Sequence, residues 1–114
     1  AELARIVRSR SKLVVSFGDC AVSGNVTAMR NPLGDPEEIL RRVYVDAPDR
    51  DGQVPRAAGI VPALLPQVRP LHQVIDVEAY VPGCPPPAAR IREAIEALLA
   101  GRRPPATGES IRFG

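Results

Sequence analysis

Residues 13–20 read LVVSFGDC, and this stretch decides the fold class. Its first five residues are apolar or small and include two β-branched valines, which is typical of a short strand buried on both faces of a parallel sheet. Gly18 then predicts a turn at the end of the strand, so that Cys20 lies just beyond it. Turns at the carboxyl ends of parallel strands are where α/β proteins bind ligands. The position of Cys20 therefore bears on function as well as on fold.

Helix signals lie on both sides of this strand. Before it, apolar residues recur at helical spacing from Leu3 to Val7 and predict an opening helix. After it, Asp35 is a favoured N-cap residue and Pro36 occupies the first helical position, so a second helix is expected to begin there. The residues that this second helix is expected to bury are Ile39, Leu40 and Val43.

A second strand and a third helix follow later in the chain. Residues 75–81 alternate apolar and polar side chains, which predicts a strand that ends at Pro82-Gly83-Cys84. A helix entered through three prolines should then run to a stop at Gly101. Its expected apolar face comprises Ile91, Ile95, Leu98 and Leu99. Alternating strands and helices predict an α/β fold with parallel strands, of which two strands make only about half of a doubly wound domain.

The segments between these elements are rich in turn-forming residues. Residues 21–34 predict a structured loop, in which a helical turn is allowed. Residues 47–60 predict an exposed loop, and residues 62–70 predict at most a short helix that prolines interrupt. The tail from residue 102 to residue 114 is expected to be mostly loop.

Composition excludes several classes of protein. The 114 residues are 45% hydrophobic and 25% charged with a net charge of +2, as in an average globular domain, and the arginines are scattered rather than gathered into a nucleic-acid-binding stripe. No apolar run approaches the length of a membrane span, and no signal peptide opens the chain. We therefore expect a soluble, cytoplasmic protein with no membrane span and no nucleic-acid partner. Because the chain opens inside a helix without Met or a cap, we also expect residues ahead of Ala1.

The two cysteines are the candidate functional residues. Cys20 and Cys84 each follow a predicted strand in a turn that contains glycine, and such turns lie on one rim of a parallel sheet. The two thiols would then converge on one site. Two alternatives stay open at this point: two unrelated buried cysteines that pack as small apolar residues, and a disulfide, which a cytoplasmic location disfavours.

Two motifs carry a resemblance to a known family. Residues 17–26 read FGDCAVSGNV and are followed by Ala28-Met29-Arg30-Asn31, while residues 81–88 read VPGCPPPA and the chain ends on Ile111-Arg112-Phe113-Gly114. Together they resemble the iron–sulfur small subunit of NAD-reducing, cytoplasmic nickel–iron hydrogenases. The Gly-Cys-Pro-Pro part is shared with hydrogenase small subunits in general and with the related 20 kDa subunit of NADH:quinone oxidoreductase. The first motif favours the NAD-linked branch.

The resemblance implies a fold, a cofactor and partners. It implies a flavodoxin-like parallel sheet with flanking helices, of which residues 1–114 form the C-terminal part of a single domain. It also implies a [4Fe–4S] cluster with Cys20 and Cys84 as two of its four thiolate ligands; the family's other two come from a Cys-x-x-Cys motif that this sequence lacks, and we expect a preceding segment to supply them. FMN is left open as a second cofactor: residues 18–25 could touch its phosphate, as flavodoxin-like rims do, but a loop role is the one expected of them.

The implied function is electron transfer between two partners. One partner is the hydrogenase large subunit, which carries the nickel–iron site and cleaves H₂, and the other is a diaphorase module that binds NAD. On this interpretation the chain has no catalytic residues of its own. Asp19 is expected to be a turn or cap residue, with cluster tuning as the alternative, and His72 is expected to be structural, with a ligand role as the alternative.

Two other hypotheses stay open. The chain could belong to the cluster-bearing subunit of a respiratory quinone oxidoreductase, or it could be a cofactor-free α/β interaction domain whose cysteines are structural. An iron assay separates the second hypothesis from electron transfer, and a comparison of H₂ and quinone activity separates the first.

Overall fold

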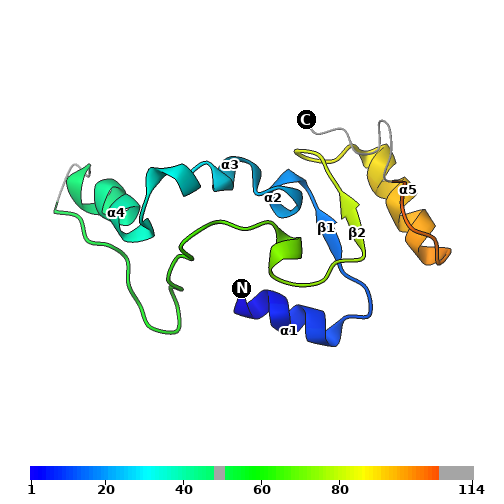
Figure 1. Cartoon of the computed structure of the whole chain (residues 1–114), viewed down its shortest axis with the longest axis horizontal. Coiled ribbons are helices and arrows are strands. Elements are labelled where there is room, and N and C mark those ends of the chain that lie inside the picture. Colours follow the sequence, from blue (N-terminus) through cyan, green and yellow to red (C-terminus); the bar gives the residue numbers. More distant parts are fainter. Residues whose placement is uncertain (48–50, 106–114) are drawn as a thin grey trace. The chain divides into compact units, whose positions relative to one another are not determined.

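The computed structural model describes residues 1–47 and 51–105 of the chain (Figure 1). These residues form two compact units. The first unit comprises Ala1–Thr27 and the described residues from Arg69 onward, and the second comprises Ala28–Val68. The closing motif at residues 111–114 lies outside the described residues.

The first unit is built around a parallel pair of strands. Strand β1 spans Val15–Phe17 and strand β2 spans Ala79–Val81, with Val15 opposite Ala79 and Phe17 opposite Val81. The helices of this unit are α1 (Glu2–Arg10), α2 (Asp19–Val22) and α5 (Ala88–Leu99), with a 3₁₀ turn η3 (Leu71–Gln73) before β2. Helix α3 (Asn25–Ala28) also belongs to it except for Ala28, the first residue of the second unit. The predicted α/β class with parallel strands and flanking helices is confirmed. Both strands are shorter than expected, and Phe17 is half exposed rather than buried on both faces.

Helix α5 packs against β2 through small side chains. Ala94 and Ala97 are its buried residues, whereas Ile95 is 51% exposed and Leu99 is 84% exposed. The predicted helix is confirmed, but the predicted apolar face is wrong in part. Alanine on the contact face lets the helix backbone approach the strand closely. Ile91 and Leu98 are half-buried beside this face.

Helix α1 is tied to the start of both strands through Glu78. The Arg8 guanidinium donates to both carboxylate oxygens of Glu78 at 2.9 and 2.8 Å, and the backbone N–H of Val14 donates to Glu78 Oε2 at 2.6 Å. The Val14 hydrogen bond is the main cause, and Arg8 a further cause, of a Glu78 pKa below the ordinary value of 4.5. The apolar face predicted for this helix is exposed at Leu3, Ile6 and Val7.

Replacing Glu78 with glutamine is expected to remove a pH-dependent part of the stability. Because the folded-state pKa of Glu78 is depressed, its contribution is fully present above pH 4.5 and is lost as pH falls through the lower folded value. The free energies of urea unfolding of the wild type and of Glu78→Gln should therefore differ most at neutral pH, and the difference should shrink as the pH falls below 4.5 through the depressed folded-state pKa. Glu96→Gln, at an exposed position of α5, controls for the loss of one negative charge. A difference between wild type and Glu78→Gln that stays constant from pH 7 to pH 3 would contradict the assignment.

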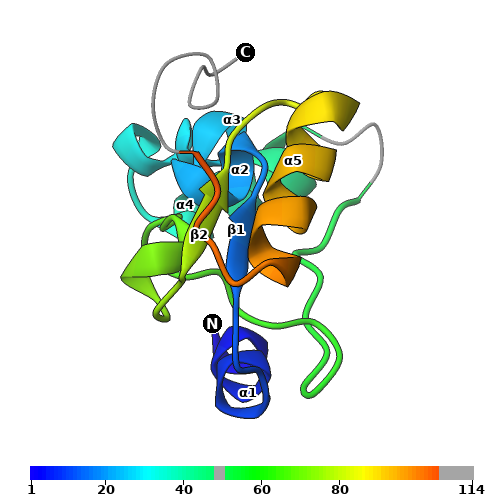
Figure 2. The same ribbon diagram turned by 90° about the vertical axis from the view of Figure 1, so that its right-hand side faces the viewer.

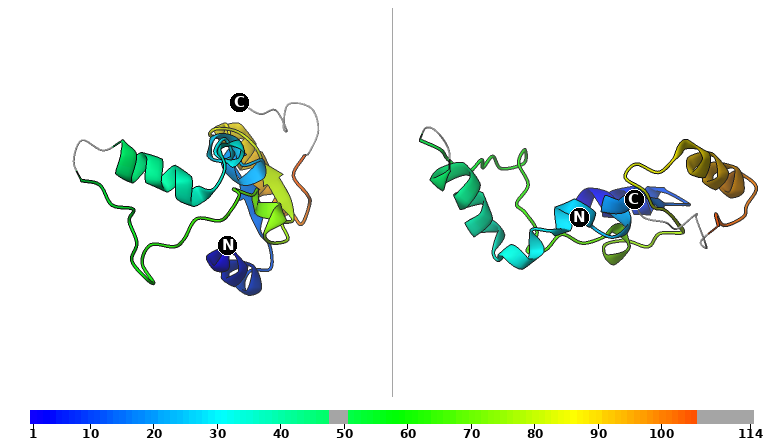
Figure 3. Two further views of the ribbon diagram at one scale, coloured as in Figure 1. Left: turned by 60° about the vertical axis from the view of Figure 1, so that its left-hand side comes forward. Right: turned by 90° about the horizontal axis from the view of Figure 1, so that it is seen from above.

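The second unit contains a 3₁₀ turn η1 (Asn31–Leu33), helix α4 (Pro36–Arg41) and its continuation as a π-helix, η2 (Arg42–Asp46) (Figure 3). The predicted cap is confirmed, because Asp35 Oδ1 accepts a hydrogen bond from the backbone N–H of Glu37 at 2.8 Å. The prediction that α4 buries its apolar face is wrong: none of its residues is buried within the described chain, and Val43 is 55% exposed. In this unit α4 faces a segment without helix or strand, which covers its apolar side chains less completely than a sheet would.

The long segment from residue 51 to residue 68 runs without a helix. The short helix allowed around residues 62–70 does not form there, in keeping with its prolines. Two hydrogen bonds join Asn31 to the backbone of Val68, one donated by Asn31 Nδ2 at 2.9 Å and one accepted by Asn31 Oδ1 at 2.8 Å. Across residues 1–47 and 51–105, no helix has the length and apolar character that a membrane span requires.

Candidate functional site

The two cysteine-bearing turns lie at the same edge of the sheet. Strands β1 and β2 are parallel, so α2 and the turn after β2 leave the sheet at one end (Figure 2). Backbone hydrogen bonds continue beyond the strands, from Gly18 N to the carbonyl of Val81 at 2.8 Å and from Asp19 N to the carbonyl of Gly83 at 3.0 Å. The predicted common rim is therefore present, and the turns are joined one residue before each cysteine.

Both thiols are free and exposed. Cys20 is the second residue of α2, and Cys84 follows the buried residues Pro82 and Gly83. The alternative of two buried cysteines that pack as small apolar residues does not fit this exposure, and no disulfide joins them. What the arrangement can do chemically is offer two accessible sulfur ligands from one edge of the sheet.

The turn that carries Cys84 is closely packed around Gly83. Gly83 has a φ of +137°, and a Cβ atom at this position would lie 2.4 Å from the Cα atom and 2.7 Å from the N atom of Pro86. From α5, Arg90 Nη1 donates a hydrogen bond to the carbonyl of Pro82 at 2.7 Å. Only glycine fits this turn, whose backbone is held from two sides.

Asp19 lies in the turn after β1, as the sequence predicts, but it is the first residue of α2 and not the cap, which is Gly18. Its Oδ1 accepts a hydrogen bond from the backbone N–H of Gly83 at 2.5 Å. The residue is only 6% exposed. No sequence signal marks this contact, because its partners are 64 positions apart.

No complete metal-binding group is present in the part of the chain that the structure describes. Across residues 1–47 and 51–105, no three His, Cys, Asp or Glu side chains are gathered in a way that could hold a metal ion. His72 lies edge-on to the ring of Tyr80, with ring centroids 5.8 Å apart, in line with the structural role expected for it. Cys20 and Cys84 are thus at most part of a ligand set.

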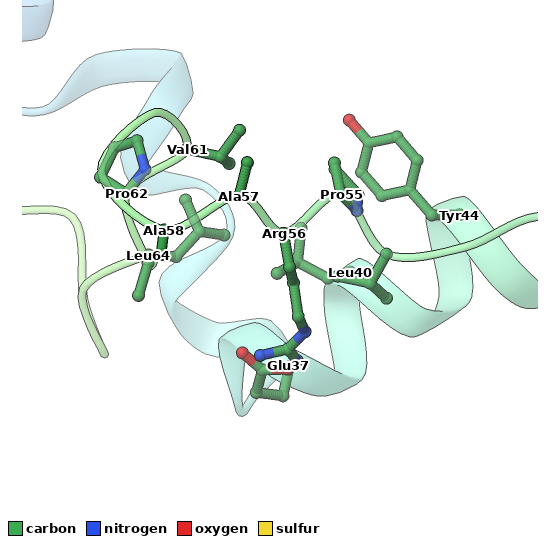
Figure 4. Close-up of a pocket in the computed structure, with 12 residues that line it drawn as sticks. Glu37, Leu40, Tyr44, Pro55, Arg56, Ala57, Ala58, Val61, Pro62 and Leu64 are labelled. Carbon is green, nitrogen blue, oxygen red and sulfur yellow. Dashed lines mark hydrogen bonds and ion pairs between the residues drawn. The ribbon is translucent and has the colours of Figure 1, made fainter.

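A separate pocket of about 380 Å³ lies within the second unit (Figure 4). Leu40 and Tyr44 of the α4–η2 helix form one wall, and the segment from Pro55 to Leu64 forms the other. Arg56 makes an ion pair with Glu37 beside the otherwise mainly apolar lining. Sequence reasoning missed this pocket, because its walls come from a helix and a proline-containing loop with no motif. It contains no sulfur ligand.

Comparison with known proteins shows the family to which this chain belongs. Residues 1–98 match the family model described as NADH ubiquinone oxidoreductase, 20 Kd subunit. Several curated relatives are subunits of F420-non-reducing hydrogenases. The chain is 41% identical over 103 residues to a subunit of the enzyme from Methanothermobacter thermautotrophicus, covering 88% of this chain and 32% of the relative. It is 31% identical over 113 residues to an iron–sulfur subunit of the enzyme from Archaeoglobus profundus, covering 90% and 35%.

A solved structure agrees with these relatives. A chain in the crystal structure of an NAD⁺-reducing [NiFe]-hydrogenase in the H₂-reduced state matches with a TM-score of 0.88 and 32% sequence identity. The match covers 99% of this chain and 64% of that one. The chain thus spans about a third of the length of these two curated relatives and just under two thirds of the solved chain.

Proposed function

The chain belongs to the family of the 20 kDa subunit of NADH ubiquinone oxidoreductase, and on this premise we propose that it is an electron-transfer part of a nickel–iron hydrogenase. The observation that carries the proposal is the pair of exposed thiols on two turns that are hydrogen-bonded to each other. Support comes from relatives named as hydrogenase subunits, one of them an iron–sulfur subunit.

The donor set fits part of an iron–sulfur cluster. Thiolate sulfur is the usual protein ligand of such clusters, and a [4Fe–4S] cluster takes four. Cys20 and Cys84 would hold two of its corners, and the other two thiolates would have to come from cysteines outside these 114 residues. When bound, the cluster supplies one-electron transfer. This chain would hold the two ligands at the sheet edge through the hydrogen bond from the backbone N–H of Asp19 to the carbonyl of Gly83.

The remaining parts of the proposal concern the complex. We infer that residues 1–114 form the C-terminal part of one flavodoxin-like domain, docked to a large subunit with the nickel–iron site. Diaphorase subunits would pass the electrons to NAD⁺, which is supported by the likeness to the NAD⁺-reducing hydrogenase. FMN bound at residues 18–25 of this chain stays a prediction from the sequence. A cytoplasmic location of the complex is part of this proposal, because it would give the complex access to NAD⁺ as electron acceptor. We assign no catalytic residue to this chain.

The test is a spectrum of the complex under H₂. The full-length subunit, purified with its large subunit, should develop the electron paramagnetic resonance (EPR) signal of a reduced [4Fe–4S] cluster when H₂ is admitted, and the signal should fade when NAD⁺ is added. A methyl viologen control shows that the large subunit is active with an artificial acceptor. Absence of any cluster signal in an active complex would rule out this role, and a signal that fades with viologen but not with NAD⁺ would rule out the NAD-linked part.

A second candidate function is favoured by the family description, which names a respiratory subunit. In that case electrons would flow from NADH to a quinone, not from H₂ to NAD⁺. Two assays of the purified complex decide between them, one with NADH as donor and a quinone analogue as acceptor, the other with H₂ as donor and NAD⁺ as acceptor, because a respiratory subunit would support NADH-driven quinone reduction and no H₂ consumption.

A further inference from the structure

We propose that Asp19 is a positioning residue that fixes Cys84 relative to Cys20. Two hydrogen bonds run between Asp19 and Gly83, one from the backbone N–H of Asp19 to the carbonyl of Gly83 at 3.0 Å and one from the backbone N–H of Gly83 to Asp19 Oδ1 at 2.5 Å. We call this pair of hydrogen bonds the Asp19–Gly83 clamp. This inference rests on the proposed function, in which Cys20 and Cys84 are ligands of an iron–sulfur cluster.

The clamp fixes both peptide planes that flank Gly83. The bond to the Gly83 N–H sets the plane of the Pro82–Gly83 peptide, and the bond to the Gly83 carbonyl sets the plane of the Gly83–Cys84 peptide. Because a peptide plane includes the next Cα atom, the second bond places the Cα atom of Cys84. Cys20 directly follows Asp19 in the chain. The hydrogen bonds of Asp19 therefore fix the backbone position of Cys84 relative to that of Cys20.

The side chain of Asp19 is not used for another structural task. Asp19 is the first residue of α2, whose N-cap is Gly18, and in the described part of the chain its carboxylate accepts from the backbone N–H of Gly83. Within residues 1–47 and 51–105, its bond to Gly83 is the one side-chain hydrogen bond between the turns at 18–20 and 82–84. A carboxylate at a helix start is usually explained by capping. Here it reaches across to the second cysteine turn.

Burial makes the side-chain bond hard to replace. Asp19 is 6% exposed and Gly83 is buried, so water has little access to the N–H group if its acceptor is removed. A buried donor without a partner is unfavourable, and the turn would rotate to bring that N–H to another acceptor. Such a rotation changes the direction of the Cys84 side chain, which is why we expect a cluster effect from a residue that is not a ligand.

Two substitutions in the full-length protein, purified with its large subunit, separate positioning from charge. Asp19→Ala removes the acceptor, whereas Asp19→Asn keeps an oxygen that can accept from Gly83 N–H. Asp35→Ala is the matched control, since Asp35 also accepts a backbone N–H with its carboxylate, from Glu37 at 2.8 Å, in the other unit. The readouts are the EPR line shape of the reduced cluster and the rate of iron loss to a chelator.

We expect Asp19→Ala to shift the EPR line shape and to lose iron about 10-fold faster or more, as is typical when an outer partner of a ligand is removed. Asp19→Asn and Asp35→Ala should stay close to the wild type in both readouts. If Asp19→Ala does not accumulate, Asp19→Ser is compared with the wild type in its place. The serine hydroxyl is shorter than the carboxylate and reaches Gly83 N–H poorly, so the rate of iron loss from Asp19→Ser should lie between the rates of Asp19→Ala and Asp19→Asn. Wild-type behaviour of Asp19→Ala, or of Asp19→Ser in its place, overturns the inference and leaves the proposed function standing. A wild-type complex without a cluster overturns both.

Discussion

Replacing Gly83 with alanine is expected to destabilise the full-length protein by about 3 kcal/mol or more. The new Cβ atom would lie 2.4 Å from the Cα atom and 2.7 Å from the N atom of Pro86, and 3.0 Å from the carbonyl oxygen of Pro85. All three are backbone atoms, so no side chain can rotate to make room. The φ of +137° adds backbone strain for any residue with a Cβ atom. Urea unfolding measures the loss.

Gly101→Ala is the matched control for this change. Gly101 also has a positive φ, of +68°, but no atom lies within 4 Å of the position that a Cβ atom would take there. Its replacement should therefore cost only the left-handed strain, about 1–2 kcal/mol. Equal losses in the two variants would show that the contact with Pro86 does not constrain the turn.

Replacing either Cys20 or Cys84 with alanine is expected to stop electron flow through the subunit. Removing a residue that merely orients a metal ligand already costs about 10- to 100-fold, so we expect loss of a ligand to lower NAD⁺ reduction by H₂ about 100-fold or more. Exchange of H₂ with the protons of water, which needs only the site of the large subunit, should persist. The two rates are measured on the same purified complex.

His72→Gln is the control for the cysteine variants, because His72 is the alternative ligand considered from the sequence and lies against Tyr80. It should leave both rates close to those of the wild type. A cysteine variant that still reduces NAD⁺ at the wild-type rate would remove that cysteine from the electron path. Loss of both rates together would instead indicate that the complex had not assembled.

Local signals in the sequence predict the elements well. The β-branched run before Gly18 forms β1, and Asp35 caps α4 as expected, because both depend on residues that are neighbours in the chain. What depends on partners elsewhere is predicted less well. β2 is limited to Ala79–Val81, although the alternating pattern begins four residues earlier, because only this stretch finds a ladder partner in β1.

Burial is the property that the sequence predicts least well. Periodicity identifies an apolar face on α5, but the helix contacts the sheet through Ala94 and Ala97 and leaves Leu99 exposed. Helical spacing gives the pattern of a face, whereas the depth of packing is set by the size of the side chains that meet the strand. A tertiary contact thus decides which of several adjacent helix positions is buried.

In the candidate site, too, features set by local sequence could be predicted and features set by distant partners could not. The placement of Cys20 and Cys84 on one rim could be predicted, since strand direction alone puts both turns there. The Asp19 contact to Gly83 and the Arg90 contact to Pro82 could not, because each joins a side chain to a backbone group that no local pattern marks. The role of the cysteines as ligands remains a proposal.

Iron and sulfide analysis of the full-length subunit tests the central claim most directly. The wild type and the double variant Cys20→Ala/Cys84→Ala are purified anaerobically in parallel, and acid-labile sulfide and iron are counted per chain, with circular dichroism to show that both are folded. We predict that the wild type holds about four more iron atoms and four more sulfide ions than the double variant, the content of one cubane cluster. Equal iron and sulfide in two folded proteins would contradict the assignment of these cysteines as cluster ligands.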